Sequence, residues 1–140
     1  MAQPDVDALT QFIRDAMPLC ATLGMRMVAQ SPEEVRLELD WDANLCTSSA
    51  GLHGGTLMAL ADSAGGACAF ANLPAGASGT STIESKTNFL GAVRSGTVTA
   101  TARPLHVGGT TIVVETEIRN GAGKLVAKTT QTQSVLRPKS

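Results

Sequence analysis

One stretch near the middle of the chain joins a glycine-rich turn to a single acid in an apolar run. It runs from Gly51 to Ser63 and reads GLHGGTLMALADS. Backbone amides freed by a glycine turn at a helix start are ready donors for a developing oxyanion. An unpaired carboxylate in an apolar setting is costly, so Asp62 stands out. An acid combined with amide donors is typical of a hydrolase site.

The spacing within this stretch limits how its parts can work together. The pattern predicts a helix from about Gly54 or Gly55 to Phe70, with Asp62 eight residues after Gly54. At a rise of about 1.5 Å per residue, the two lie about 12 Å apart along the axis. One carbonyl group cannot reach both at hydrogen-bond distance. If both act on one substrate, they come from different chains, with two sites across a dimer interface.

Other catalytic arrangements fit the sequence poorly. His53 precedes Asp62 by nine positions, about 13 to 14 Å along a helix, so a pair between them within one chain is not expected. His53 therefore either shapes the turn or acts as a general base. The serines lack the G-x-S-x-G setting of a nucleophile elbow. With only two histidines in the chain, a metal site is not expected.

Composition excludes several classes of protein. The chain has 140 residues, which suits one domain, and 43% of them are hydrophobic, which argues against disorder. The net charge is −1 and there is no basic stripe, so nucleic-acid binding is not expected. Only 16% of the residues are charged, which suggests that self-association hides some surface.

The same considerations indicate where the protein works. The N-terminus lacks a hydrophobic signal core, and the longest apolar run, Leu57 to Ala71, is too short to span a bilayer and is interrupted by Asp62. No membrane association is therefore expected. The three cysteines have no C-x-x-C spacing and are interpreted as small buried thiols in a reducing compartment. We expect a cytoplasmic protein.

Periodicity and turn residues predict an α+β fold in which one antiparallel sheet packs on one long helix. Small residues from Ala64 to Ala69 would let the sheet approach that helix closely. The other predicted elements are a helix from Pro4 or Asp5 to Met17 with a short turn to Leu23, and strands over 26–29, 34–39, 80–90, 96–105, 110–119 and 125–136, with loops at 43–52 and 73–79.

These residues resemble the hotdog-fold acyl-CoA thioesterases, in particular the phenylacetate-degradation and 4-hydroxybenzoyl-CoA type. The resemblance rests on the His53-Gly54-Gly55 turn with an acid nine positions after the histidine, and on the segments 82–90 and 123–127. It covers the chain from about Gly24 to Leu136. It implies a single hotdog domain over 1–140, with a helical segment at 1–23.

The resemblance also implies partners and roles. It implies an acyl-CoA substrate, no separate cofactor because coenzyme A is part of that substrate, and a homodimer or a dimer-of-dimers tetramer. Asp62 takes the position of the catalytic carboxylate, as nucleophile or as general base. The Gly54 N–H takes the position that polarises the thioester carbonyl. His53 flanks it, and Thr82 matches a hydroxyl that positions the attacking water.

Further positions are expected to bind the substrate, and some depart from the family. Many relatives carry Asn or Gln where this chain has Thr47, and Asn44 could replace it only after a loop shift. Relatives often place an arginine after the glycine that follows His106 and Val107, where this chain has the run Gly108-Gly109-Thr110. The expected substrate-binding residues are Gly55, Thr47, Arg94, Gly108, Gly109 and Thr110.

Two other functions remain open at this point: a non-catalytic acyl-CoA binding module, and a hotdog enoyl-CoA hydratase or dehydratase. A carrier-protein thioester is an equally acceptable substrate on the sequence alone. Leu57, Met58 and Phe89 are candidates to line a pocket for a phenyl ring or a medium-length chain.

Overall fold

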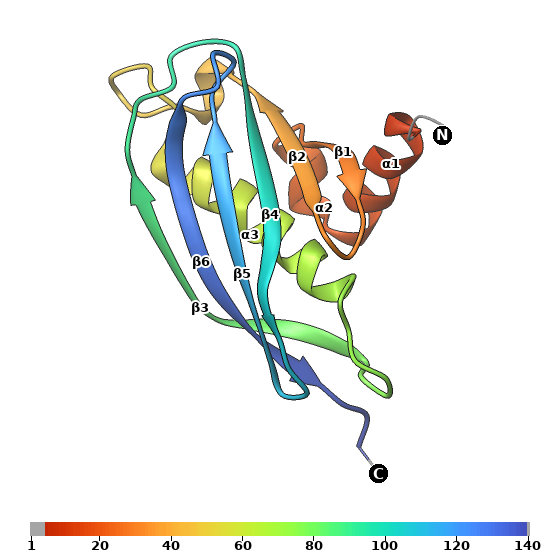
Figure 1. Ribbon diagram of the computed structural model, residues 1–140. Helices are drawn as coiled ribbons and strands as arrows, with labels where there is room; N and C mark the ends of the chain where they lie inside the picture. The colour runs from red at the N-terminus through yellow and green to blue at the C-terminus, as the bar shows by residue number, and fades with distance from the viewer. Residues whose placement is uncertain (1–4, 140) are drawn as a thin grey trace.

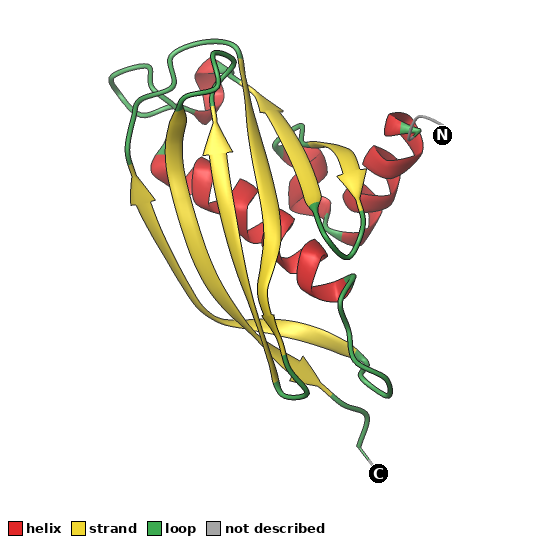
Figure 2. Ribbon diagram, in the orientation of Figure 1, coloured by secondary structure: helices red, strands yellow, loops and turns green. Residues whose placement is uncertain are grey.

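Six antiparallel strands form one sheet that curves around a central helix (Figure 1, Figure 2). The structure is a computed structural model that describes residues 5–139. The strand order is β1-β2-β4-β5-β6-β3, so β1 and β3 form the two edges. The strands are β1 (Arg26–Gln30), β2 (Val35–Asp40), β3 (Gly79–Phe89), β4 (Thr97–Val107), β5 (Thr111–Arg119) and β6 (Leu125–Leu136); the helices are α1 (Val6–Ala16), α2 (Pro18–Thr22), the short 3₁₀ turn η1 (Ala43–Leu45) and α3 (Gly54–Phe70).

The α+β architecture predicted from the sequence is confirmed, and each strand begins and ends within two residues of its predicted bounds. Pro4, predicted near the start of the first helix, lies outside the described residues. Asp5 caps that helix, because its Oδ1 accepts from the Ala8 amide at 3.0 Å. Asn120 closes the β5–β6 hairpin by accepting at Oδ1 from the amides of Ala122 and Lys124.

Helix α3 lies on the inner face of the sheet and contacts strands from β2 across to β3. The sequence predicted that its small residues permit a close approach, and Gly65 confirms this. A Cβ at Gly65 would overlap the side-chain amide of Gln131 on β6. Gly66 differs, because a Cβ there would meet nothing within 4 Å. Gly65 therefore serves the contact with the sheet, whereas Gly66 faces open space.

Helix α1 packs on β1 at the edge of the sheet, and α2 packs against α1. Ile13 is the buried residue of α1. Two polar contacts attach this helix to the chain that leads into β1. Arg14 Nε donates to the Met25 carbonyl at 2.9 Å, and the Met27 amide donates to Thr10 Oγ1 at 3.1 Å. These contacts fix α1 against the chain around β1, where it lines one cavity together with the C-terminal half of α3. No helix within residues 5–139 is both long and apolar enough to cross a membrane.

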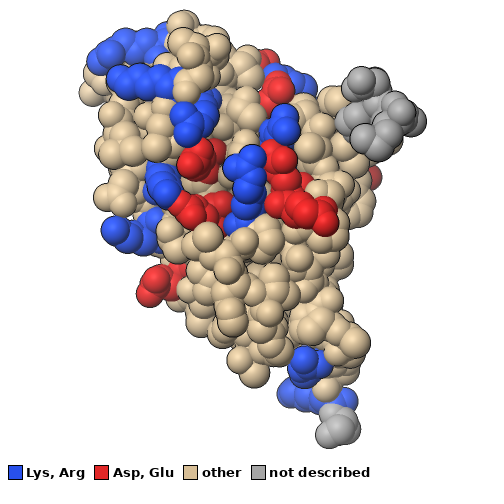
Figure 3. All heavy atoms as spheres, viewed as in Figure 1, with Lys and Arg blue, Asp and Glu red and all other residues tan. Residues whose placement is uncertain are grey.

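Charged side chains gather on the outer face of the sheet, where Figure 3 shows alternating acids and bases across the strands. Glu34 pairs with Arg36 and Arg103, and Glu115 pairs with Lys128 on the neighbouring strand. Pairs at such exposed positions contribute little to stability. They do mark this face as solvated, so the chemistry has to be sought on the inner face and at the edges.

The three thiols provide a direct test of the packing. Cys20 and Cys68 are buried, and burial raises the pKa of the Cys68 thiol to about 11. Cys46 is half-buried in the loop before α3, where its Sγ donates to the Asp42 carbonyl at 3.3 Å. At pH 8, iodoacetamide should therefore modify Cys46 alone in the folded protein, and all three cysteines in urea, as read by mass spectrometry. Modification of Cys68 at the rate of Cys46 without denaturant would contradict this packing.

Candidate active site

His53 caps α3 and prepares its first turn. Its Nδ1 accepts from the Gly55 amide at 2.7 Å, and its carbonyl accepts from the Thr56 and Leu57 amides. Nδ1 therefore carries no proton, and a neutral ring has its proton on Nε2. This geometry favours the reading of His53 as the residue that shapes the turn. The Gly55 amide, expected to face substrate, is already engaged by His53.

The Gly54 amide is the free donor at this helix end. Within residues 5–139 it has no acceptor, while its neighbours in the first turn all donate to His53. A free N–H at a helix start carries the positive end of the helix dipole. Phe89 on the edge strand β3 lies over Gly54, since a Cβ there would be 3.0 Å from the Phe89 Cζ atom. The amide therefore sits beside the β3 edge.

Asp62 is held by a side-chain network rather than buried. The sequence suggested an acid within apolar surroundings, but in the single chain Asp62 is exposed. The reason is that it lies beside the cavity between α1, α3 and β3 rather than under the sheet. Its Oδ1 accepts from Thr82 Oγ1 at 3.1 Å and from Gln131 Nε2 at 3.2 Å. Its Oδ2 accepts from no residue in the described part of the chain.

A bulge in β3 brings Thr82 to this network. Thr82 pairs with Gln133 on β6, whereas Glu84 pairs with Thr132, so Ile83 is an extra residue in the ladder. Gln133 faces the buried side of β6 and Thr132 does not. Without the bulge Thr82 and Glu84 would share one face, because side chains alternate along a strand. The bulge therefore turns Thr82 inward while Glu84 faces out.

Asp62 lines a cavity of about 560 Å³ between α1, α3 and β3. One face of α3 supplies Asp62, Gly66, Ala67 and Phe70 to its wall. The residues proposed from the sequence for an acyl pocket are not among its lining residues: Leu57 is in the core, while Met58 and Phe89 are exposed. The remaining lining residues come from α1 with its C-cap and from the strands β1, β3 and β6: Phe12, Ile13, Ala16, Met17, Gln30, Gly79, Thr80, Thr82 and Gln133.

The other expected substrate-binding residues fall at two ends of the molecule. Thr47 lies in the loop before α3, where its hydroxyl contacts Ser49 Oγ at 3.0 Å. Arg94 is exposed next to Val93, whose carbonyl accepts from the Leu52 amide at this same end. The turn 108–110 lies beyond the far end of β4, about 33 Å away along an extended strand. Within one chain Arg94 and this turn therefore cannot flank the same group.

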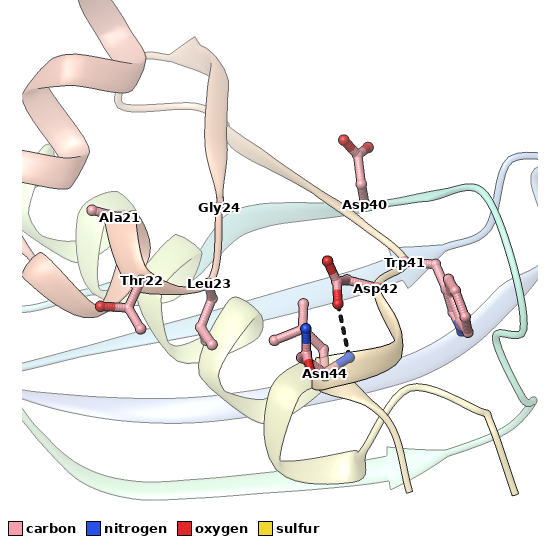
Figure 4. A pocket seen from close by; sticks show the side chains of 9 residues that line it. Ala21, Thr22, Leu23, Gly24, Asp40, Trp41, Asp42 and Asn44 are labelled. Atoms are coloured by element: carbon pink, nitrogen blue, oxygen red, sulfur yellow. Dashed lines mark hydrogen bonds between the residues drawn. The ribbon is translucent and has the colours of Figure 1, made fainter.

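A second cavity lies away from Asp62, between α2, β2 and η1 (Figure 4). Its volume is about 360 Å³, and Asn44 lies on its wall beside Asp42, which accepts from the Asn44 amide at 2.7 Å. Asn44 thus does not reach the Asp62 site. Asp40 on the same wall is bound by Arg26, which with the Thr97 hydroxyl holds the pKa of Asp40 at about 2. Asp40 is therefore ionised and a weak base at neutral pH.

The sequence reading missed Gln131, Gln133 and the contribution of α1. Both glutamines are fully buried, at 0% and 1% exposure. The two glutamines could have been found from the alternation of β6, where every second residue from Ala127 to Gln133 faces inward. In a segment that reads TTQTQ, polar residues occupy both faces, so composition alone does not distinguish the inner set.

Comparison with known proteins places the chain in a family. The model of the thioesterase superfamily matches residues 51–127, which is more than half of the chain. "Putative esterase ComA2" of Bacillus subtilis is 30% identical over 119 residues, covering 85% of this chain and 94% of its own. Thioesterase HI1161 of Haemophilus influenzae aligns with a TM-score of 0.86 at 26% identity, covering 97% and 93% of the two chains.

A variant of thioesterase PA1618 from Pseudomonas aeruginosa aligns with a TM-score of 0.85 at 27% identity over 96% of both chains. The family match includes α3 with Gly54 and Asp62, and also the bulged edge strand that carries Thr82. The fold predicted from the resemblance is therefore confirmed. The protein belongs to the thioesterase superfamily and is a thioester hydrolase.

Proposed function

We propose that the chain hydrolyses acyl-CoA thioesters to a free acid and coenzyme A. The observation that carries this proposal is the Asp62 carboxylate, which is anchored at Oδ1, free at Oδ2, and set in the wall of a largely apolar cavity. A carboxylate beside an apolar acyl site can attack a thioester carbonyl or activate water there. The free Gly54 amide supplies the donor for the oxyanion.

The cavity favours an uncharged acyl group. Aromatic and aliphatic side chains dominate its wall, and Asp62 is the single charged residue among those that line it within residues 5–139. An acyl group that carries its own carboxylate would meet Asp62, and the described residues that line the cavity include no cation to offset the repulsion. Aromatic and medium-length aliphatic acyl groups fit these walls, which is consistent with the phenylacetate and 4-hydroxybenzoyl-CoA type.

The edge strand β3 offers the means to combine two chains. It exposes Ile83 and Phe89, at 64% and 51%, and as an edge it has unpaired backbone groups. Within one chain, Phe89 lies beside Gly54, and Thr82 is hydrogen-bonded to Asp62. In an antiparallel pairing about a two-fold axis between Ser85 and Lys86, Phe89 of one chain lies opposite Thr82 of the other. Such a homodimer brings the two half-sites together twice.

The same symmetry reunites the expected coenzyme-binding groups. Arg94 lies at the Gly54 end of a chain, whereas the 108–110 turn lies at the other end, where Arg137 Nη2 donates to the Gly109 carbonyl at 3.1 Å. A site built from two chains takes Arg94 from one and the turn with Arg137 from the other. These guanidinium groups are suited to contact phosphates.

The reaction follows from these positions in one of two ways. The thioester oxygen accepts from the Gly54 amide of one chain, and Asp62 of the other acts through Oδ2. Attack by Oδ2 on the carbonyl carbon expels the thiolate and leaves an anhydride, which water then cleaves. Alternatively, Oδ2 takes a proton from a water molecule that attacks the carbonyl carbon, the C–S bond breaks, and the leaving thiolate takes up that proton. Both routes end in the acid and the free thiol.

Replacement of the acid tests the function. Asp62→Asn should lower kcat for octanoyl-CoA or benzoyl-CoA by about 10²- to 10⁴-fold, measured as free thiol, because the amide is neither base nor nucleophile. Asp7→Asn, at an exposed acid in the first turn of α1, is the matched control. Wild-type turnover in Asp62→Asn would overturn the assignment of Asp62 as the reacting acid. Loss of enoyl-CoA absorbance without thiol release would instead indicate a hydratase.

The backbone donor can be removed with little change to the helix. Gly54 is the first residue of α3, a position that accepts proline because its N–H makes no helical bond. Gly54→Pro should be about 10²-fold slower in kcat than Gly54→Ala, which adds the same Cβ beside Phe89 but keeps the N–H. Circular dichroism checks that both variants keep the helix. Equal rates in the two variants would exclude this amide as the oxyanion donor.

A further inference from the structure

Two buried glutamines on β6 form the base of the Asp62 site. Gln131 and Gln133 face inward on alternate positions, and neither is accessible to solvent to any useful extent. Burial of a side-chain amide is unfavourable unless its groups find partners. Gln131 Nε2 donates to Asp62 Oδ1 at 3.2 Å, and Gln133 Nε2 donates to Thr82 Oγ1 at 2.6 Å.

The chemistry of the donors fixes the direction of this network. An amide nitrogen can only donate, so Thr82 Oγ1 accepts from Gln133. The single hydroxyl proton of Thr82 is then directed to Asp62 Oδ1, at 3.1 Å. Thr82 has no proton left to give to water, and can only accept from it. The role expected for Thr82 from the sequence, to hold the attacking water, therefore becomes secondary to its contact with Asp62.

The fold tolerates two unfavourable features to keep Gln131 in place. Gln131 Oε1 is buried and has no partner within residues 5–139. In addition, α3 carries Gly65 where a Cβ would overlap this amide, although glycine within a helix is less stable than alanine. An apolar side chain of similar size would avoid the orphaned carbonyl. Packing alone therefore does not explain a glutamine at this position.

We propose that Gln131 and Gln133 are positioning residues for thioester hydrolysis, and that they make Oδ2 the reacting oxygen of Asp62. Gln131 acts on the carboxylate directly, and Gln133 acts through Thr82. Both donors converge on Oδ1, which fixes the rotation of the carboxylate and leaves Oδ2 free. This inference rests on the proposed function, because it assumes that Asp62 is the reacting acid.

Truncation of the amides should separate activity from stability. Gln131→Leu and Gln131→Met remove the donor and the orphaned carbonyl together. We expect kcat for octanoyl-CoA to fall at least 10-fold, with KM within about 3-fold and a melting temperature equal to or above that of the wild type. Thr129→Val is the matched control, since Thr129 is buried two positions earlier on β6 and its hydroxyl contacts Thr87, away from Asp62.

A double-mutant cycle tests the indirect path. Gln133→Leu should lower kcat in the wild type but have little further effect in Thr82→Val, because the path from Gln133 to Asp62 is then already broken. Equal effects of Gln133→Leu in both backgrounds, or wild-type kcat in Gln131→Leu or Gln131→Met, would overturn the proposal. If Asp62→Asn is inactive while these variants keep wild-type kcat, the positioning role fails and the hydrolase assignment stands. If Asp62→Asn is itself active, the proposed function fails first.

Discussion

The spacing of two groups along one rigid helix is the constraint on which the rest of this site depends. Helix α3 holds the free Gly54 amide and the Asp62 carboxylate eight residues apart, about 12 Å along its axis. A shift of the helix would not change this separation, and the contacts of Gly65 with Gln131 and of Asp62 with Thr82 fix the helix against the sheet. In the proposed homodimer, each chain therefore presents half of a site at each of two positions.

The edge position of β3 allows a second chain to pair there, which would bring an amide and an acid from different chains together. The strand lies last in the sheet, carries Thr82 beside the acid, and places Phe89 beside the amide. The outer face of the sheet is occupied by ion pairs, whereas the site and its supporting glutamines are on the inner face and at this edge. In the proposed homodimer, one strand and one helix therefore carry both the interface and the reacting groups.

Much of this could be predicted from sequence because it depends on local patterns. The glycine turn and the apolar run after it located α3 from about Gly54 or Gly55 to Phe70, and the rise per residue of a helix separated the two half-sites. Other features depend on contacts between distant segments. The bulge at Ile83 reverses the face of Thr82, and the match of Gly65 with Gln131 appears only once β6 is in register with its neighbours. No periodicity within one element indicates either feature, nor does it place Phe12 of α1 in the cavity wall.

The central claim is that one working site takes its amide from one chain and its acid from another. A mixed dimer of Gly54→Pro and Asp62→Asn chains, purified through two different affinity tags, tests it most directly by thiol release. One of its two sites combines the intact Gly54 and the intact Asp62 from different chains, so about half of the wild-type activity per dimer should return. Activity no higher than that of the two parent variants would show that the amide and the acid do not act across the interface.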